Sequence, residues 1–300
     1  MSKKNNPLNF VKPRTQARVA AITMFKSNQI PSLGTSHTYE NSLSLVGDWM
    51  KCTGGGALTE LSVKRAKKYL NERAKTVSQS TLNKDRLALQ ALLQQTGKLR
   101  NDQRLPVVKA DRETVLKSRN YTPQQLAEIV KHMRPHNALA TEIAHAAGLR
   151  AHEFITIARR DERSPDKRPA DPQKFCGREN HTRYVVTGKG GLTREVSLPN
   201  HLAERLEAVR LPAPEPRRDR KIMYVSQYRI GGGQALSMAF TRASKAALEF
   251  SNGLHGTRHS YAQQRHGEAQ RLLGDPTRAK TVVSQEIGHF RADITDTYLR

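Results

Sequence analysis

The 300-residue chain carries 51 lysines and arginines against 27 aspartates and glutamates, which gives a formal net charge of +24 and a pI near 10.4. Such an excess repels itself unless a polyanion lies nearby, so a nucleic acid is the first partner to consider, although a ribosome-associated or merely basic soluble protein would have the same charge. The two cysteines, Cys52 and Cys176, are distant and lack metal-ligand spacing, so they support neither a disulfide framework nor a zinc ribbon, and no apolar run approaches the roughly 20 residues of a membrane helix.

Residues 1–34 are polar and basic and contain Pro7, Pro13 and Pro31. This composition predicts an N-terminal tail with at most a short helix around residues 16–25. A DNA-contacting arm and a solvated leader both fit it, and no signal-peptide core follows the basic residues. A reducing cytosol, with the protein on the nucleoid, is the expected location.

Residues 35–105 contain three helical patterns. Tyr39, Leu43, Val46 and Met50 recur at the spacing of one helix face, and similar stripes follow at residues 63–74 and 82–93. Basic side chains occupy the other faces of the second and third patterns: Lys64, Arg65, Lys67, Lys68, Lys84 and Arg86. The segment therefore predicts a small all-α DNA-binding domain that contacts duplex phosphates, although a solvated surface is the default interpretation of any single lysine.

Residues 106–121 are polar and are predicted to be a linker, and a second domain is predicted over residues 122–300. Thr122 is a good N-cap, Pro123 fits the first helical position, and Gln125 stands where a capping box requires it. A helix from this point and another at about 138–147 are expected, the second ending at Gly148.

The rest of the second domain is predicted to be mainly helical with a small β-sheet. Residues 161–182 are charged and form a predicted loop. Residues 184–187 and 193–198 are predicted strands, because the glycines between them allow a tight turn. Helices are expected at about 200–210, 235–250, 255–267 and 276–289. The fold class expected is thus an all-α N-terminal domain followed by an α+β domain.

Two segments early in this domain could bind phosphate. In Ala-Gly-Leu-Arg (residues 147–150), a glycine ends one helix and Arg150 stands at the predicted start of the next, where an anion is favoured. Lys189 lies at the tip of the predicted hairpin, from which it could reach a minor groove or protonate a leaving oxygen. Each signal alone is weak, because both patterns are common in unrelated proteins.

Two further segments lie near the C-terminus. His255 and Arg258 are three residues apart and share one helix face, and no other histidine has an arginine three residues later. His289 follows Gly288, and Tyr298 comes nine residues after it. DNA cleavage without a metal needs a nucleophile, cations on the non-bridging oxygens and proton donors and acceptors, and these residue types supply all of them.

In this order and at these spacings, the segments resemble the catalytic signature of the tyrosine recombinase (phage-type integrase) family. That family uses an arginine in a G-L-R-x-x-E segment, a hairpin lysine, H-x-x-R, a G-H segment and a C-terminal tyrosine. The corresponding positions in this sequence are Arg150, Lys189, His255, Arg258, His289 and Tyr298. The resemblance covers residues 122–300, and the helical domain before them resembles the family's core-binding domain in layout only.

The resemblance implies a role for each of these residues. Arg150 and Arg258 would hold the scissile phosphate, and His289 would bond a non-bridging oxygen. His255 would take the Tyr298 proton or bond the phosphate, and Lys189 would protonate the departing 5′ oxygen. Glu153 would orient Arg150 or cap its helix rather than react.

The implied product is a 3′-phosphotyrosyl link with a free 5′ hydroxyl, and no cofactor or metal is needed. The implied partner is double-stranded DNA, bound by a homotetramer on two duplexes, with accessory DNA-bending proteins in some systems and no membrane. Integration or excision of a mobile element is the expected role. A type IB topoisomerase-like enzyme and an inactive architectural DNA-binding protein are the alternatives.

Overall fold

The computed structural model describes residues 11–113, 117–220 and 222–300, without the side chain of Lys189. The chain divides into two compact units, Met1–Val115 and Leu116–Arg300, and each unit has a hydrophobic core of its own. None of the described helices is long and apolar enough to cross a membrane.

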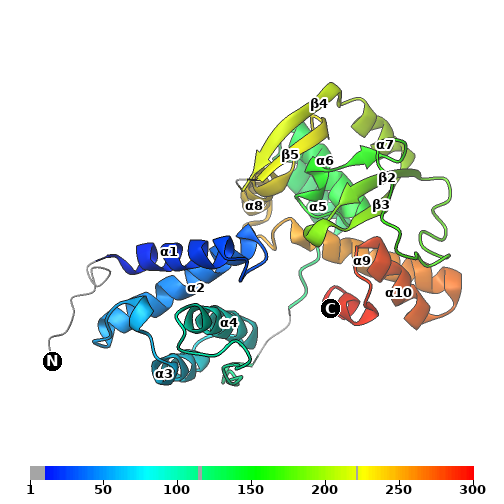
Figure 1. Cartoon of the computed structure of the whole chain (residues 1–300). Helices are drawn as coiled ribbons and strands as arrows, with labels where there is room; N and C mark the ends of the chain where they lie inside the picture. Colours follow the sequence, from blue (N-terminus) through cyan, green and yellow to red (C-terminus); the bar gives the residue numbers. More distant parts are fainter. Residues whose placement is uncertain (1–10, 114–116, 221) are drawn as a thin grey trace, which may run out of the picture. The chain divides into compact units, whose positions relative to one another are not determined.

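Unit 1 is all-α (Figure 1). Its elements are α1 (Pro13–Lys26), α2 (Leu33–Cys52), the short 3₁₀ helix η2 (Leu58–Glu60), α3 (Val63–Ala74) and α4 (Gln79–Gln95). Ser32 caps α2 and Ser62 caps α3, since each hydroxyl accepts a hydrogen bond from the backbone three residues later. The three apolar stripes expected from the sequence lie in the core of this unit, with Leu43, Val46 and Leu70 completely buried.

The interpretation of residues 1–34 as a tail is wrong from Pro13 onward. Helix α1 packs along α2, and it buries Ala17, Ala21 and Met24 in the core of unit 1. The contact is close, since a Cβ added to Gly47 would lie 2.8 Å from Pro13. Two of the three buried side chains are alanines, which give a weak apolar stripe in the sequence. Residues 1–10 lie outside the described part of the chain.

The predicted linker, residues 106–121, is packed at both of its ends. Gln79 bonds the backbone at Val108 (3.0 Å) and Ala110 (2.9 Å), and the amide of Asp111 donates to Ala74 in α3 (3.1 Å). At the other end, Tyr121 is 1% exposed and belongs to the core of unit 2. Polar composition hid these contacts, because they are made largely by the backbone.

Unit 2 is mainly helical with two small antiparallel sheets. Its helices are α5 (Pro123–Lys131), α6 (Pro135–Ala147), η3 (Glu153–Ile155), η4 (Lys189–Gly191), α7 (Asn200–Glu207), α8 (Gly233–Leu248), α9 (His255–Leu273), α10 (Pro276–Glu286) and η5 (Ala292–Thr297). The capping box at Thr122 is present, and each predicted helix except the one expected to start at Arg150 is found near its expected range. The expected fold class is confirmed.

The first sheet has the order β1 (Ala158–Arg159), β2 (Thr182–Thr187), β3 (Thr193–Leu198), with Thr187 paired to Thr193 at the turn. The predicted strand–turn–strand is therefore confirmed. The second sheet, β4 (Arg210–Asp219) and β5 (Ile222–Tyr228), is not apparent from the sequence. Its first strand contains Pro212, Pro214 and Pro216. Prolines argue against a strand in the sequence, but an edge strand tolerates them where the backbone amide would have no acceptor.

The main core of unit 2 lies between α5, α6, α8 and the inner face of β2 and β3. A second cluster lies beside it, where α9 and α10 run side by side (Figure 1). This cluster contains Tyr261, Ala262, Val283, Ile287 and Tyr298, so the last residues of the chain pack against both helices.

Candidate active site

The segment after α6 is a tight turn rather than the start of a helix. Gly148 ends α6 with φ of +63°, and a Cβ there would lie 2.6 Å from the ring of Tyr261. A turn and the 3₁₀ helix η3 follow, so the expected helix N-terminus at Arg150 is wrong. The turn nonetheless orients Arg150, because both its backbone amide (2.8 Å) and its Nη1 (3.0 Å) donate to Glu153.

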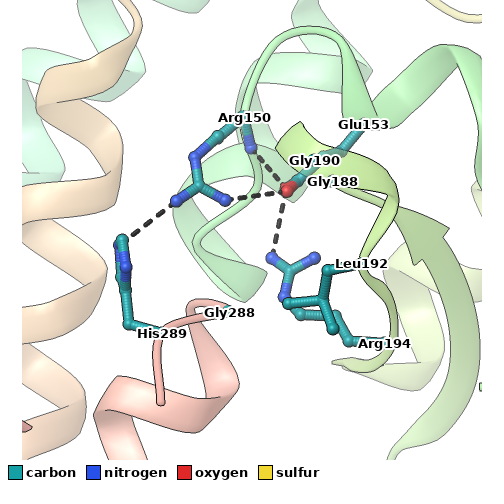
Figure 2. A pocket seen from close by; sticks show the side chains of 8 residues that line it. All are labelled: Arg150, Glu153, Gly188, Gly190, Leu192, Arg194, Gly288 and His289. Atoms are coloured by element: carbon teal, nitrogen blue, oxygen red, sulfur yellow. Dashed lines mark hydrogen bonds and ion pairs between the residues drawn. The ribbon is translucent and has the colours of Figure 1, made fainter. Parts of the chain in front are cut away.

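Glu153 is a completely buried carboxylate that bonds two arginines. Its Oε1 accepts from Arg150, and its Oε2 accepts from Nη2 of Arg194 on β3 at 3.1 Å (Figure 2). Burial raises the pKa of this carboxyl, but Arg194, Arg258 and Arg150 outweigh burial and lower the pKa to about 2. The carboxylate therefore stays charged and fixes both guanidinium groups.

The turn between β2 and β3 borders the same region. Gly190 and Gly191 have φ of +80° and +82°, and the Gly188 amide donates to the carbonyl of Leu192 at 2.7 Å. The backbone of Lys189 lies between Gly188 and Gly190, which both line the pocket described below. Its side chain is outside what the structure describes, so the reach of Lys189 into the pocket remains a prediction.

Arg258, on the first turn of α9, is completely buried and connects three elements. Its Nη1 donates to the Gly148 carbonyl (2.5 Å), its Nη2 donates to the Ile287 carbonyl, and its Nε lies 3.3 Å from the Tyr298 hydroxyl. Burial, followed by the repulsion of Arg150, lowers the pKa of Arg258 to about 10, which leaves it charged at neutral pH.

Tyr298 follows η5 and is 5% exposed. Besides Arg258, its hydroxyl lies 3.4 Å from Nε2 of His289. The centroids of the His255 and His259 rings lie 5.5 and 4.9 Å from that of Tyr298. Burial of the imidazole and then Arg258 lower the pKa of His255, although the residue as a whole is exposed.

His289 joins the tyrosine to the first arginine. Its Nε2 lies 3.1 Å from Nη2 of Arg150, and because a guanidinium can only donate, Nε2 is the acceptor and the ring is neutral in this contact. Burial, followed by Arg258 and Arg150, lowers the pKa of His289 to about 4, in agreement with that assignment.

A pocket of about 320 Å³ opens between the turn, the hairpin and the end of α10 (Figure 2). It is lined by Arg150, Glu153, Gly188, Gly190, Leu192, Arg194, Gly288 and His289. Two guanidinium groups face one carboxylate in this lining, with a third guanidinium, that of Arg258, buried close by. The excess of fixed positive charge suits an anion such as a phosphate. Among the described residues there is no cluster of His, Cys, Asp or Glu that could hold a metal ion.

Comparison with known proteins gives matches of structure only. A scan against protein-family models finds no match, and neither does a search of curated proteins. The chain aligns with XerH site-specific recombinase bound to difH substrate over 94% of its own length and 81% of that chain (TM-score 0.55, identity 16%). For the Tn1549 transposon integrase in complex with transposon right end DNA, the shares are 95% and 94% (TM-score 0.54, identity 15%). For a lambda integrase dimer bound to a COC′ core site, they are 100% and 82% (TM-score 0.58, identity 14%).

The chain has the tyrosine recombinase fold. Within the tyrosine recombinase fold, the structure brings together the side chains of five of the six residues proposed from the sequence: Arg150, His255, Arg258, His289 and Tyr298. They come from the turn after α6, the first turn of α9, the residues after α10 and the end of η5. Only the Lys189 side chain cannot be placed with them.

Sequence reasoning missed two members of the site. Arg194 is 5% exposed and bonds Glu153. The sequence signal for it was the two-residue period of strand 193–198, which places Arg194 on the same face as the buried Val196 and Leu198. His259 is 5% exposed against the Tyr298 ring, and it stands four residues after His255 on the same face of α9.

Proposed function

We propose that the chain is a site-specific DNA recombinase that cleaves and rejoins DNA through a 3′-phosphotyrosyl intermediate on Tyr298. One observation supports this above the others. The Tyr298 hydroxyl lies within 3.4 Å of both Arg258 and His289, and His289 in turn bonds Arg150. A nucleophile and a set of phosphate-binding cations, distant in the sequence, thus meet at one place.

In the proposed cleavage step, the Tyr298 oxygen attacks phosphorus and forms an O–P bond while the bond from phosphorus to the 5′ oxygen breaks. The phenol proton passes to His255, and Lys189 supplies a proton to the departing 5′ oxygen. Arg150, Arg258 and His289 stabilise the charge on the non-bridging oxygens. The reverse attack by a 5′ hydroxyl restores the strand with no external energy, since the ester retains the energy of the phosphodiester.

The proposed partners follow from the same chemistry and the charge of the chain. The net charge of +24 supports binding to double-stranded DNA. A lambda integrase tetramer bound to a Holliday junction also matches this chain, over 95% of its length with a TM-score of 0.57, which supports a homotetramer on two duplexes. Integration or excision of a mobile element, in the cytoplasm and with accessory DNA-bending proteins where needed, is the role we propose.

The test is covalent capture on DNA of unspecified sequence. The intact protein is incubated with nicked duplexes whose sequence is randomised around the nick, so that the short cleaved strand diffuses away and the adduct is trapped. DNA that remains attached to protein in detergent is recovered and sequenced. We expect a defined sequence to be enriched by the intact protein and none by Tyr298→Phe, which lacks only the nucleophilic oxygen.

Two other results would contradict the proposal. No adduct from the intact protein would leave an architectural DNA-binding role. Rapid relaxation of a supercoiled plasmid without paired sites, with no sequence enriched, would indicate a topoisomerase-like activity instead.

A further inference from the structure

A buried ion pair lies behind the candidate site and takes no part in the proposed reaction. Arg265 on α9 is completely buried and Glu286 at the end of α10 is 1% exposed. Arg265 Nη2 lies 2.9 Å from Glu286 Oε1, and its Nε donates to both carboxylate oxygens at 3.1 and 2.9 Å. Charges are removed from water only at a large cost, so a pair with this many bonds calls for a structural reason.

The Glu286 side chain also holds a second part of the chain. Its Oε1 accepts from the Phe175 amide (3.0 Å) and its Oε2 accepts from the Tyr261 hydroxyl (2.7 Å). Arg265 donates to the carbonyl of Cys176 at 2.9 Å. Phe175 and Cys176 lie in the charged loop between β1 and β2, and we call residues 171–178 of it the docked segment.

Two further hydrogen bonds hold the two ends of the docked segment. The Asp171 amide donates to Oε1 of Gln285 at 2.7 Å, and Arg178 bonds Glu268 on α9 at 2.9 Å. The segment therefore lies against both α9 and α10, with Glu286 at the centre of its contacts.

The backbone at the end of α10 holds the candidate site itself. The Glu286 carbonyl accepts from Nε of Arg194 at 3.2 Å, and the Ile287 carbonyl accepts from Arg258. Gly288 follows with φ of +77°, and a Cβ there would lie 2.8 Å from Nε of Arg194. Two guanidinium groups are thus oriented by the backbone carbonyls of Glu286 and of the residue after it.

We infer that Glu286, neutralised by Arg265, is a positioning residue that couples the docked segment to the orientation of Arg194 and Arg258. The inference rests on the proposed function, because the orientation matters only if these arginines act on a phosphate. Stability alone does not account for the pair, since well-packed apolar residues can replace a buried ion pair with little or no loss of stability. The arrangement is specific because the Glu286 side chain bonds the segment while its backbone bonds the site.

The test compares stability, DNA affinity and cleavage rate in a double variant, Arg265→Met with Glu286→Leu. The DNA is the nicked duplex recovered by covalent capture with the intact protein. We expect the melting temperature to fall, because the Phe175 amide, the Tyr261 hydroxyl and the Cys176 carbonyl lose their partners, while the protein still folds and the Kd for the duplex stays near that of the parent. The single-turnover rate of adduct formation should fall about ten- to a hundredfold, the cost of small misplacements of groups that contact the reacting atoms. Trypsin should also cut faster after Lys174.

A matched control removes another ion pair from the same unit. Arg205 on α7 is paired with Glu142 on α6. The double variant Arg205→Gln with Glu142→Gln makes the same change in charge, and it should cleave at the parental rate.

The outcomes separate the two proposals. A double variant that is folded at the assay temperature, binds the duplex with the parental Kd and cleaves at the parental rate would overturn the positioning role. If the double variant does not fold, Tyr261→Phe decides, because it removes one bond to Glu286 and leaves the ion pair intact. A two- to tenfold slower rate at constant Kd is then expected, in the range of such indirect couplings, and an unchanged rate would overturn the inference. Absence of an adduct from the intact protein would refute the proposed function, and the positioning role with it.

Discussion

The Tyr298 oxygen lies 3.3 Å from Nε of Arg258, although the two residues are 40 positions apart in the chain. Arg258 is completely buried and is held by carbonyls at the ends of α6 and α10. The tyrosine and the arginine therefore meet within one chain. Because the carbonyls at two helix ends fix the position of Arg258, we expect the geometry of its guanidinium to matter for cleavage as much as its charge does.

Replacement of Arg258 by lysine should separate charge from geometry. Lysine keeps the positive charge but cannot bond two carbonyls and a phenol from one planar group, since its ammonium is a compact point charge. We expect a loss of at least about a hundredfold in the rate of adduct formation, the size of effect seen when one fixed donor to a transition state is removed. The free energy of unfolding should fall by about 1–3 kcal/mol, because buried carbonyls lose their donors.

The measurement is adduct formation on the captured duplex, together with urea unfolding. Arg271→Lys, on an exposed part of α9, is the control and should change neither quantity. Cleavage by Arg258→Lys at the parental rate would show that the charge alone suffices.

Glu153 should make the stability of unit 2 depend on pH in the acidic range. Its pKa falls from 4.5 to about 2 in the folded protein, so the folded state binds the proton less readily than the unfolded state does. The stabilisation is fully present above about pH 4.5 and is lost as the pH falls toward 2. A shift of this size corresponds to about 3 kcal/mol, taken as an order of magnitude.

Glu153→Gln should remove that dependence. It should be less stable than the parent at pH 6, where Arg150 and Arg194 would lack their anion, and the difference should shrink between pH 5 and pH 3. Urea unfolding at a series of pH values measures it. A difference that stays constant over this range would mean that the carboxylate is not held in its charged form.

The sequence was sufficient for the α-helices of unit 2 and for the β2–β3 hairpin. Those features depend on local signals, such as the Thr122 capping box and the glycines at 188–191. A short helix was expected within α1, but its place in the core of unit 1 was missed, because Ala17 and Ala21 pack by close approach and give a weak apolar stripe. Strand β4 was missed because its three prolines argue against a strand. They are tolerated here because the sheet has only two strands, so one side of β4 needs no hydrogen-bond donors.

The site was predicted as a set of side chains, without the contacts that orient them. Spacing placed His255 and Arg258 on one helix face, and the structure agrees. It could not reveal that Arg194 shares Glu153 with Arg150, because the contact between Arg194 on β3 and Glu153 in η3 joins residues 41 positions apart in the chain. The sequence also placed Arg150 at the start of a helix. The structure has a turn there instead, and Gly148 before it packs against the ring of Tyr261.

Arg194 should contribute to cleavage although no sequence motif marks it. Arg194→Gln removes a cation from the pocket and the hydrogen bond that Nε of Arg194 donates to the Glu286 carbonyl. We expect adduct formation to slow by about tenfold or more, since fixed charges near a developing anion act strongly in a site shielded from water. Arg160→Gln, whose side chain is 60% exposed and paired with Glu195, is the matched control and should cleave normally. Equal rates for the two variants would assign Arg194 a purely structural role.

His289 should report directly on the charge of the pocket. Its pKa is lowered to about 4 by burial, then by Arg258 and Arg150, so removal of a cation must move that pKa back toward 6.5. We therefore expect a higher pKa in Arg150→Gln than in the parent, and a higher pKa in the parent when inorganic phosphate is added, because an anion offsets the arginines. Long-range ¹H–¹⁵N spectra of the imidazole across pH 3–8 measure both shifts. As a control, Arg160→Gln should leave the pKa of His289 unchanged. If neither Arg150→Gln nor added phosphate changes that pKa, the pocket does not bind anions beside this ring.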